Sequence, residues 1–195
     1  KDDYVYDGTP TYKQASTGLW YDSYGNVTRK YFYGDVAVTG DERDENTEYY
    51  YDTTNWIVSF PSSTYVKDSG GATKAQAWFT YDTKGNLLTK TSWLNGGANN
   101  PVITYTYDSY GNQASVKDAR NNTTTISYDS TYTYPTTTTN PLGHISLATY
   151  DLRFGKPLTE IDPNYNTTSY QYDVFGRLIK VKNPNDMESP YGTVS

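Results

Sequence analysis

Cysteine is absent from this chain of 195 residues, which excludes disulfide bonds, thiolate metal sites and cysteine nucleophiles. Leu, Ile, Val and Phe together number only 31, and a share below ~20% is typical of disordered chains. No run of ~18 apolar residues is present, so the sequence predicts no membrane-spanning helix. The first residues, Lys1-Asp2-Asp3-Tyr4, do not resemble a signal peptide.

Basic residues are also in deficit, because 16 Lys and Arg stand against 22 Asp and Glu, giving a net charge of −6. Nucleic-acid binding depends on a basic face, so the composition argues against a nucleic-acid partner. Part of the acidity is concentrated in residues 41–48. This stretch is either a solvated loop or a patch for a cation or a basic partner.

Aromatic residues are abundant where aliphatic residues are scarce. The chain has 23 Tyr and four Trp, and each buried ring can contribute ~150–250 Å² of contact surface. Tyrosine is favoured on pleated, half-buried surfaces. The composition therefore argues against disorder and predicts β structure held together by aromatic layers.

A repeated pair of residues, Tyr-Asp, is the main signal in the sequence. Tyr128, Tyr150 and Tyr172 are separated by 22 residues each, and the earlier spacings are less regular. We interpret residues 1–195 as one continuous repeat region and as a fragment of a larger protein. The eight pairs are Tyr6-Asp7, Tyr21-Asp22, Tyr51-Asp52, Tyr81-Asp82, Tyr107-Asp108, Tyr128-Asp129, Tyr150-Asp151 and Tyr172-Asp173.

The pair is followed by a glycine in most copies, four residues after the tyrosine at Gly25, Gly85, Gly111 and Gly176. Glycine supplies the positive φ of a turn. The Tyr150 copy has its glycine one residue later, at Gly155, as a β-bulge would produce. The Tyr51 copy has Asn55 at this position, and asparagine also tolerates positive φ. The Tyr128 copy departs most, with Tyr132, Tyr134 and Pro135 in this region.

The motif has the pattern of a β-hairpin. Two residues before each tyrosine lies an apolar or aromatic residue, and a period of two places both on one face of a strand. The aspartate that follows can accept backbone N–H bonds in a turn. Further turn signals join the units at residues 118–121, 140–143, 162–165 and 183–186.

These patterns predict an all-β fold in which tandem β-hairpin repeats form a long, twisted and coiling antiparallel sheet. No segment of ten or more residues has helical periodicity. The motif tyrosines, aspartates and glycines are structural residues in this interpretation. We expect Tyr172→Ala and Gly176→Val to damage folding rather than a catalytic step.

The sequence predicts no catalytic, cofactor-binding or metal site. The chain has a single histidine, His144, and no Gly-x-Ser-x-Gly elbow, so His144 is interpreted as a turn residue. The repeated aspartates could pair as glycosidase carboxylates or bind calcium, but one structural role in every turn explains all of them. Exposed tyrosines could stack on sugars or on protein segments, whereas packing against neighbouring hairpins is the simpler interpretation. Glycosylation sequons occur at Asn26, Asn121, Asn122 and Asn166.

Several stretches resemble a known family. Residues 172–178, Tyr-Asp-Val-Phe-Gly-Arg-Leu, resemble the YD-repeat signature of Rhs proteins. The run from Tyr128 to Leu178 is similar to the repeat region of Tc toxin B components and SpvB-like proteins. It contains Asn140-Pro141-Leu142-Gly143-His144, Tyr150-Asp151-Leu152-Arg153-Phe154-Gly155-Lys156-Pro157 and Asp162-Pro163-Asn164.

The resemblance implies a structural segment of a secreted or cell-surface protein. In Rhs and Tc proteins, such repeats form a β shell that encloses a toxic segment until delivery. The implied partners are the remaining repeats of the shell and an enclosed toxin segment. Alternatively, the resemblance to teneurins and to wall-associated relatives implies an adhesion or carbohydrate-binding module with a glycan partner.

The chain departs from complete family members in two ways. It is too short to close a shell, and it lacks the Asp-Pro-x-Gly autoproteolysis motif. Asp162-Pro163-Asn164-Tyr165 is superficially close to that motif, but Tyr165 replaces its glycine. We therefore interpret this segment as a repeat turn.

Overall fold

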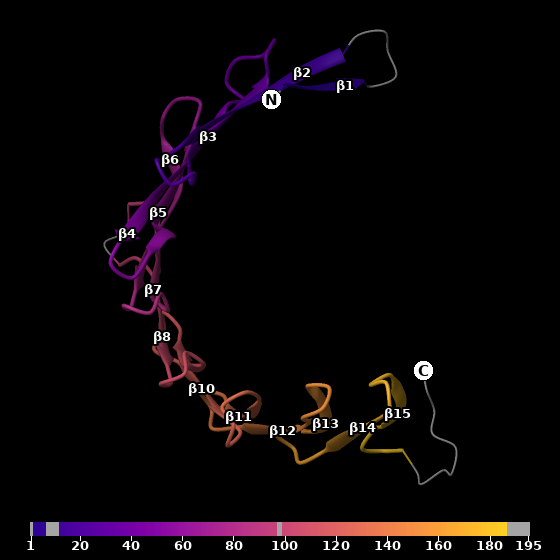
Figure 1. Cartoon of the computed structure of the whole chain (residues 1–195). Coiled ribbons are helices and arrows are strands. Elements are labelled where there is room, and N and C mark those ends of the chain that lie inside the picture. Colours follow the sequence, from indigo (N-terminus) through magenta and orange to yellow (C-terminus); the bar gives the residue numbers. More distant parts are fainter. Residues whose placement is uncertain (1, 7–11, 97–98, 187–195) are drawn as a thin grey trace. The chain divides into compact units, whose positions relative to one another are not determined.

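The fold of the described chain is entirely β (Figure 1). The computed structural model describes residues 2–6, 12–96 and 99–186, so the predicted pair Tyr6-Asp7 lies outside the described side chains. No helix of these residues is long and apolar enough to cross a membrane. The strands are β1 (Asp2–Tyr6), β2 (Tyr12–Tyr21), β3 (Val27–Asp35), β4 (Arg43–Asp52), β5 (Ile57–Asp68), β6 (Thr73–Tyr81), β7 (Leu87–Ser92), β8 (Val102–Tyr107), β9 (Gln113–Lys117), β10 (Thr123–Tyr128), β11 (Pro135–Thr139), β12 (Ile145–Asp151), β13 (Lys156–Ile161), β14 (Thr167–Tyr172) and β15 (Leu178–Lys182).

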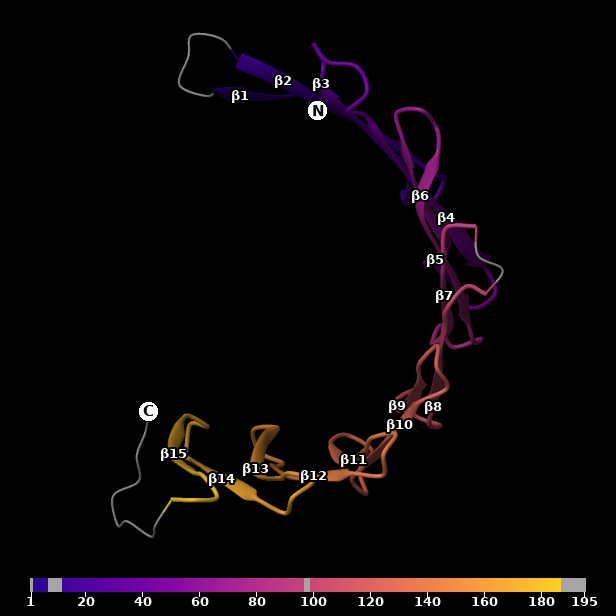
Figure 2. The same cartoon turned by 180° about the vertical axis from the view of Figure 1, so that it is seen from behind.

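The order of the strands in the sheet follows their order in the sequence, from β1 to β15. Consecutive strands pair in antiparallel fashion, for example β12 with β13 and β13 with β14. The view from behind shows the same succession of hairpins (Figure 2). The predicted all-β fold of tandem antiparallel hairpins is confirmed.

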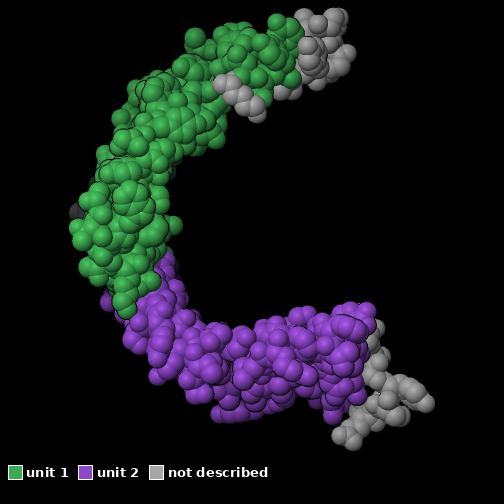
Figure 3. Space-filling model, viewed as in Figure 1, with its two compact units in different colours: residues 1–104 green, residues 105–195 purple. Residues whose placement is uncertain are grey.

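The chain divides into two compact units, residues 1–104 and 105–195 (Figure 3). The first unit contains the long strands, with β5 reaching 12 residues. The second unit contains strands of five to seven residues joined by short turns at both ends. The regular spacing of 22 residues in the sequence belongs to this second unit.

The described residues include no fully buried hydrophobic side chain. Among the polar and charged residues that the structure describes, only Ser63 and Asp151 are buried, at 5% and 7% exposure. The reason is architectural, because a single sheet with each strand paired to its sequence neighbours has no second layer to cover its faces. Stability must therefore come from the hydrogen-bonded ladder, the turns and the contacts between side chains of adjacent strands.

The period of two in the sequence appears as an alternation of exposure. In β12, Ser146, Ala148 and Tyr150 are half-buried, whereas Ile145, Leu147 and Thr149 are exposed. In β13 the same alternation leaves Pro157, Thr159 and Ile161 half-buried. The motif tyrosine therefore lies on the better covered face, two residues from a small or apolar neighbour, as the pattern predicts.

Candidate functional site: the tyrosine-aspartate turns

Each motif aspartate that the structure describes closes a turn by accepting hydrogen bonds from the residues that follow it. In the turn of Asp108, Oδ1 accepts the backbone N–H groups of Tyr110 and Asn112, both at 2.9 Å. The second oxygen, Oδ2, accepts the side-chain amide of Asn112 at 3.0 Å. The backbone N–H of Asp108 in turn donates to the Asn112 carbonyl at 2.9 Å. One carboxylate therefore organises the whole turn.

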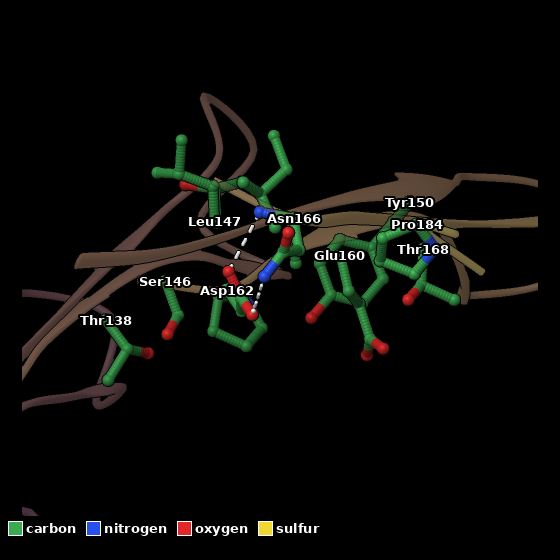
Figure 4. A pocket seen from close by; sticks show the side chains of 13 residues that line it. Thr138, Ser146, Leu147, Tyr150, Glu160, Asp162, Asn166, Thr168 and Pro184 are labelled. Carbon is green, nitrogen blue, oxygen red and sulfur yellow. Dashed lines mark hydrogen bonds between the residues drawn. The ribbon is translucent and has the colours of Figure 1, made fainter. Parts of the chain in front are cut away.

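The same turn occurs at the opposite ends of the hairpins. Asp162 accepts the backbone N–H of Asn164 at 2.8 Å. It also accepts the backbone N–H of Asn166 at 2.9 Å and the Asn166 side-chain amide at 2.8 Å (Figure 4). Asp118 binds Arg120 and Asn122 in the same way. The sequence predicts turns in these segments, but the hydrogen bonds that they share with the motif turns were not predicted. An Asp-x-x-x-Asn spacing in both kinds of turn is the signal that identifies it.

The carboxylate geometry lowers the pKa of the turn aspartates. For Asp162, the side-chain hydrogen bond from Asn166 is the largest cause of a lowered pKa, followed by the Asn166 backbone N–H. Partial burial would raise the pKa of Asp22, but hydrogen bonds from Tyr51, Asn26 and Tyr24 outweigh it and lower the pKa to about 2. These carboxylates are therefore ionised acceptors at neutral pH, which suits a structural role.

The position of positive φ is filled by glycine in most motif turns. Gly25, Gly85, Gly111, Gly155 and Gly176 all have φ between 65° and 90°. At Gly155 the extra residue lies in the turn itself, because its N–H bonds the Asp151 carbonyl four residues back. The insertion is thus accommodated in the turn and is not the origin of a bulge.

In two motif turns an aromatic residue, and not a glycine, has the positive φ. In the Tyr51 copy, Trp56 has a φ of 55°, so the prediction that Asn55 takes the positive φ is wrong. Asn55 instead donates its backbone and side-chain N–H groups to Asp52. In the Tyr128 copy, Tyr132 has a φ of 56°. Both side chains contact a tyrosine of the preceding turn, Tyr24 and Tyr110 respectively.

A shift of register accompanies the motif tyrosine in several hairpins. Opposite Tyr172, for example, the pairing moves from Gln171 with Lys180 to Tyr172 with Leu178, which leaves Ile179 without a partner. The same shift occurs next to Tyr21, Tyr81, Tyr128 and Tyr150. A bulge of this kind interrupts the ladder and leaves a backbone group in need of another partner.

The tyrosine of the next hairpin supplies that partner. The hydroxyl of Tyr172 donates to the carbonyl of Pro157, which lies opposite Tyr150 at its register shift. Tyr81 donates to Pro61 in the same way, at 2.9 Å. The remaining bonds of this type are Tyr49 to Val27 at 3.0 Å and Tyr128 to Gln113 at 3.2 Å.

The Tyr51 copy differs from the others in this contact. Tyr49, two residues before the motif position, makes the hydroxyl bond to the preceding hairpin. Tyr51 is 44% exposed and donates its hydroxyl to Asp22 at 2.6 Å. This bond raises the pKa of Tyr51 to about 12. The role of Tyr49 was missed because its position in the motif is shared by residues of every size.

Neighbouring turns are also tied directly to one another. The Asn26 side chain donates to the Val58 carbonyl at 2.6 Å, and the Asn112 side chain donates to the Tyr132 carbonyl at 2.7 Å. The Lys156 ammonium donates to the Gly176 carbonyl. The Tyr134 ring stacks on Tyr150, with ring centroids 4.9 Å apart. Within each unit, the motif turns thus form a connected row along one edge of the sheet.

Each unit has an open pocket on the sheet. The pocket in residues 105–195 has a volume of about 380 Å³ and includes Thr138, Tyr150, Glu160 and Thr168 (Figure 4). Tyr170 donates to Glu160 at 2.6 Å, which raises the pKa of Tyr170 to about 12.

The pocket in residues 1–104 has a volume of about 540 Å³ and includes Trp20, Arg29, Glu48 and Tyr65. Arg29 pairs with Asp44 through two hydrogen bonds, at 2.7 and 3.0 Å, and lies over the Trp20 ring. The Glu48 carboxylate accepts the Ser63 hydroxyl at 2.8 Å. Aromatic rings and paired polar groups therefore meet in this pocket.

The other residues considered for chemistry have structural surroundings. His144 is exposed at the end of the turn that Asn140 closes, where Asn140 Oδ1 accepts its N–H at 3.0 Å. Asp162 closes the turn described above, and Tyr165 follows with a φ of 65°. No group of three or more His, Cys, Asp or Glu in the described parts of the chain could hold a metal ion.

Comparison with known proteins agrees with this geometry. Residues 150–186 match the family model described as RHS Repeat. No curated protein matches the chain. Solved structures of TcdB2-TccC3 are similar over 87% of this chain, with a TM-score of 0.66 and 12% identity. The TcdB2-TccC3 structure without its hypervariable C-terminal region has the same TM-score, with 13% identity.

The chain spans 14% of the length of the first of these structures and 13% of the length of the second. At such low identity the likeness concerns the fold alone, and it covers both units of the chain. The family match falls on the last two hairpins, where the turns of Asp151, Asp162 and Asp173 and the Tyr172 hydroxyl bond are all present. Residues 150–186 therefore match the RHS Repeat model, and the chain has a fold similar to that of TcdB2-TccC3.

Proposed function

We propose that this chain is a wall segment of a β shell that encloses a toxin or other cargo and helps to deliver it. The observation that carries the proposal is the sheet itself, in which strands follow the sequence order and the described residues enclose no hydrophobic core. A globular enzyme or binding domain folds around a core of its own. A one-layer sheet is instead suited to form a wall.

The likeness to TcdB2-TccC3 supports the same function, because it covers 87% of the chain. In this proposal the immediate partners are further hairpin repeats, which continue the sheet at β1 and β15. A toxin segment or another cargo is the enclosed partner. The parent protein acts outside the cell that makes it, either secreted or at the cell surface, and this segment has no catalytic role.

A second candidate function is glycan binding by an adhesion module. The pocket that includes Trp20 favours it, because aromatic rings lie beside Arg29 and Glu48 within about 540 Å³. Sugar rings pack their apolar faces on aromatic side chains, and their hydroxyls bind such polar groups. The pairing of Arg29 with Asp44 occupies part of this polar surface, so the shell remains the first proposal.

Protease protection of the cargo in the full-length parent protein tests the shell. We expect the enclosed segment to survive protease in the wild type and to be digested when Tyr150 and Tyr172 are both replaced by alanine. The exposed Tyr165→Phe change serves as the matched control. Digestion of the cargo at the same rate in wild type and variant would overturn the proposal.

A glycan array distinguishes the second function. Glycan binding by the purified chain that is lost in Trp20→Ala would favour the adhesion module. Hydrolysis of a glycan or peptide by the purified chain would contradict both candidates and favour an enzyme.

A further inference from the structure

Tyr132 combines an unfavourable backbone with a specific ring contact. Its φ of 56° lies in the left-handed region, which a residue with a Cβ rarely adopts. Glycines occupy this position in the turns of Asp108 and Asp173. The Tyr132 ring stacks on Tyr110, with centroids 4.3 Å apart and an interplanar angle of 26°. Strain of this kind is often retained where a side chain has a function.

The two rings are held in this arrangement by their turns. The backbone N–H of Tyr110 bonds Asp108 Oδ1 at 2.9 Å, and that of Tyr132 bonds the Asp129 carbonyl at 3.0 Å. The Asn112 side chain links the turns by donating to the Tyr132 carbonyl at 2.7 Å. The contact is therefore fixed before any reaction, which favours a reaction between the two rings.

Both rings are open to solvent, with Tyr110 68% exposed and Tyr132 46% exposed. Two other tyrosine pairs are less suitable. Tyr134 and Tyr150 stack at 4.9 Å, but both residues are half-buried. Tyr51, which contacts Tyr24 at 5.4 Å, donates its hydroxyl to Asp22.

We propose that Tyr110 and Tyr132 are a site of oxidative cross-linking, at which the two phenols couple to form dityrosine. A haem peroxidase using hydrogen peroxide removes one electron and one proton from each phenol. The two phenoxyl radicals join through their ortho carbons, and the two ortho hydrogens then move to the phenol oxygens, which restores the aromatic rings. One carbon–carbon bond forms, two ring C–H bonds break, and one peroxide is reduced to two waters.

The cross-link would join the β8–β9 hairpin covalently to the β10–β11 hairpin. The chain has no cysteine, so disulfide bonds cannot make such a connection. A covalent tie restricts the unfolded chain and thereby favours the folded sheet. The proposal concerns the chemistry of this pair and does not depend on the shell.

The test treats the purified chain with horseradish peroxidase and hydrogen peroxide and measures dityrosine fluorescence. Trypsin cleaves after Lys90, Lys117, Arg120 and Arg153. We therefore expect a cross-linked peptide of residues 91–117 with residues 121–153, two hydrogens lighter than their sum. The effective concentration of tethered groups is on the order of millimolar, so at ~10 μM chain the intramolecular product should exceed chain dimers by about a hundredfold.

Tyr132→Phe and Tyr110→Phe keep the stacked ring but lack the phenolic proton, so each should abolish this peptide. Tyr165→Phe is the matched control, because Tyr165 is a turn residue that is 87% exposed, and it should leave the yield unchanged. Circular dichroism checks that the variants are folded. A peptide that persists in either variant, or a product consisting only of chain dimers, would overturn the proposal.

Discussion

The hydroxyl of Tyr172 donates a hydrogen bond of 2.9 Å to the carbonyl of Pro157, a residue of the preceding hairpin. Pro157 lies opposite Tyr150, where the register of β12 and β13 shifts. Proline has no N–H and is tolerated at such bulges. The motif tyrosine therefore stabilises the register shift in the preceding hairpin. This hydrogen bond joins two residues that are 15 positions apart in the sequence.

Tyr172→Phe tests this contact. We expect the free energy of unfolding to fall by about 0.5–1.5 kcal/mol, the usual contribution of one hydrogen bond. Tyr172→Ala should cost more, but less than the ~3–5 kcal/mol of a core truncation, because Tyr172 is only half-buried. Hydrogen exchange should become faster in β13 to β15 and remain unchanged in β8 to β10. Tyr165→Phe is the control, and uniform exchange across all variants would contradict this role.

Asp162→Asn and Asp162→Ala separate the two oxygens of a turn carboxylate. Asparagine keeps Oδ1, which accepts the N–H groups of Asn164 and Asn166, whereas alanine removes every acceptor. Asn140 already closes a turn of this type through its Oδ1. We expect Asp162→Asn to retain most of the thermal stability of the wild type. Asp162→Ala should open the turn locally, and limited proteolysis should then cleave the chain at residues 162–166. Equal protease sensitivity of the two variants would count against the turn mechanism.

Gly25→Ala and Gly176→Ala compare backbone strain with and without a steric clash. Both glycines have positive φ, 86° and 76°, which costs about 1–2 kcal/mol for a residue with a Cβ. An added Cβ meets nothing within 4 Å at Gly25, whereas at Gly176 it lies 2.8 Å from Phe154. Displacing the Phe154 ring should add about 1–3 kcal/mol. Chemical denaturation measures the free energy of unfolding of each variant, and we expect Gly176→Ala to lose more than Gly25→Ala. Equal losses in both variants would be incompatible with the Phe154 contact.

The hydrogen-bonded pair Asp22 and Tyr51 predicts that the folded chain loses stability at both low and high pH. The pKa of Asp22 in the folded chain is lowered to about 2, against ~3.9 when unfolded. The contribution of Asp22 to the stability of the fold is therefore present above pH ~3.9 and is lost as the pH falls toward 2. The pKa of Tyr51 is raised to about 12, against ~10 when unfolded. The contribution of Tyr51 to the stability of the fold is present below pH ~10 and is lost as the pH rises toward 12.

Tyr51→Phe removes the hydrogen bond that joins these two groups. The pKa of Asp22 should then rise, and the dependence of thermal stability on pH should weaken at both ends of the range. Thermal unfolding measured between pH 2 and 12 checks this result. Tyr21→Phe, which alters another exposed motif tyrosine, is the control, and an identical loss of pH dependence in that variant would refute the assignment.

The hairpins of this fold could be predicted from the sequence because their signals are local. The pair of tyrosine and aspartate ends a strand, and the glycine that follows provides the turn, as at Tyr107, Asp108 and Gly111. The bulges could not be predicted, because the register of two strands depends on how their side chains pack. Ile179 is unpaired for this reason, although nothing in its own sequence position indicates it.

The contacts between hairpins could not be predicted from the sequence either. Tyr49, and not Tyr51, bonds the preceding hairpin because its hydroxyl reaches the Val27 carbonyl. These two residues are 22 positions apart in the sequence. The positive φ of Trp56 was missed because local preference favours asparagine there. The Trp56 ring lies edge-on to the Tyr24 ring of the preceding motif turn. Propensity is a weak guide where an aromatic contact of this kind decides the conformation.

The turn-to-turn and hydroxyl contacts have a consequence for how such a chain changes over generations. Each hairpin is specified by its own turns and by one or two bonds to the hairpin before it. A duplication or deletion of about one hairpin pair therefore lengthens or shortens the sheet without disturbing distant parts, as in other repeat proteins. Substitutions elsewhere on the strands have few constraints, because no buried core must be repacked in the described residues. The fold can therefore be shared with TcdB2-TccC3 at only 12% identity.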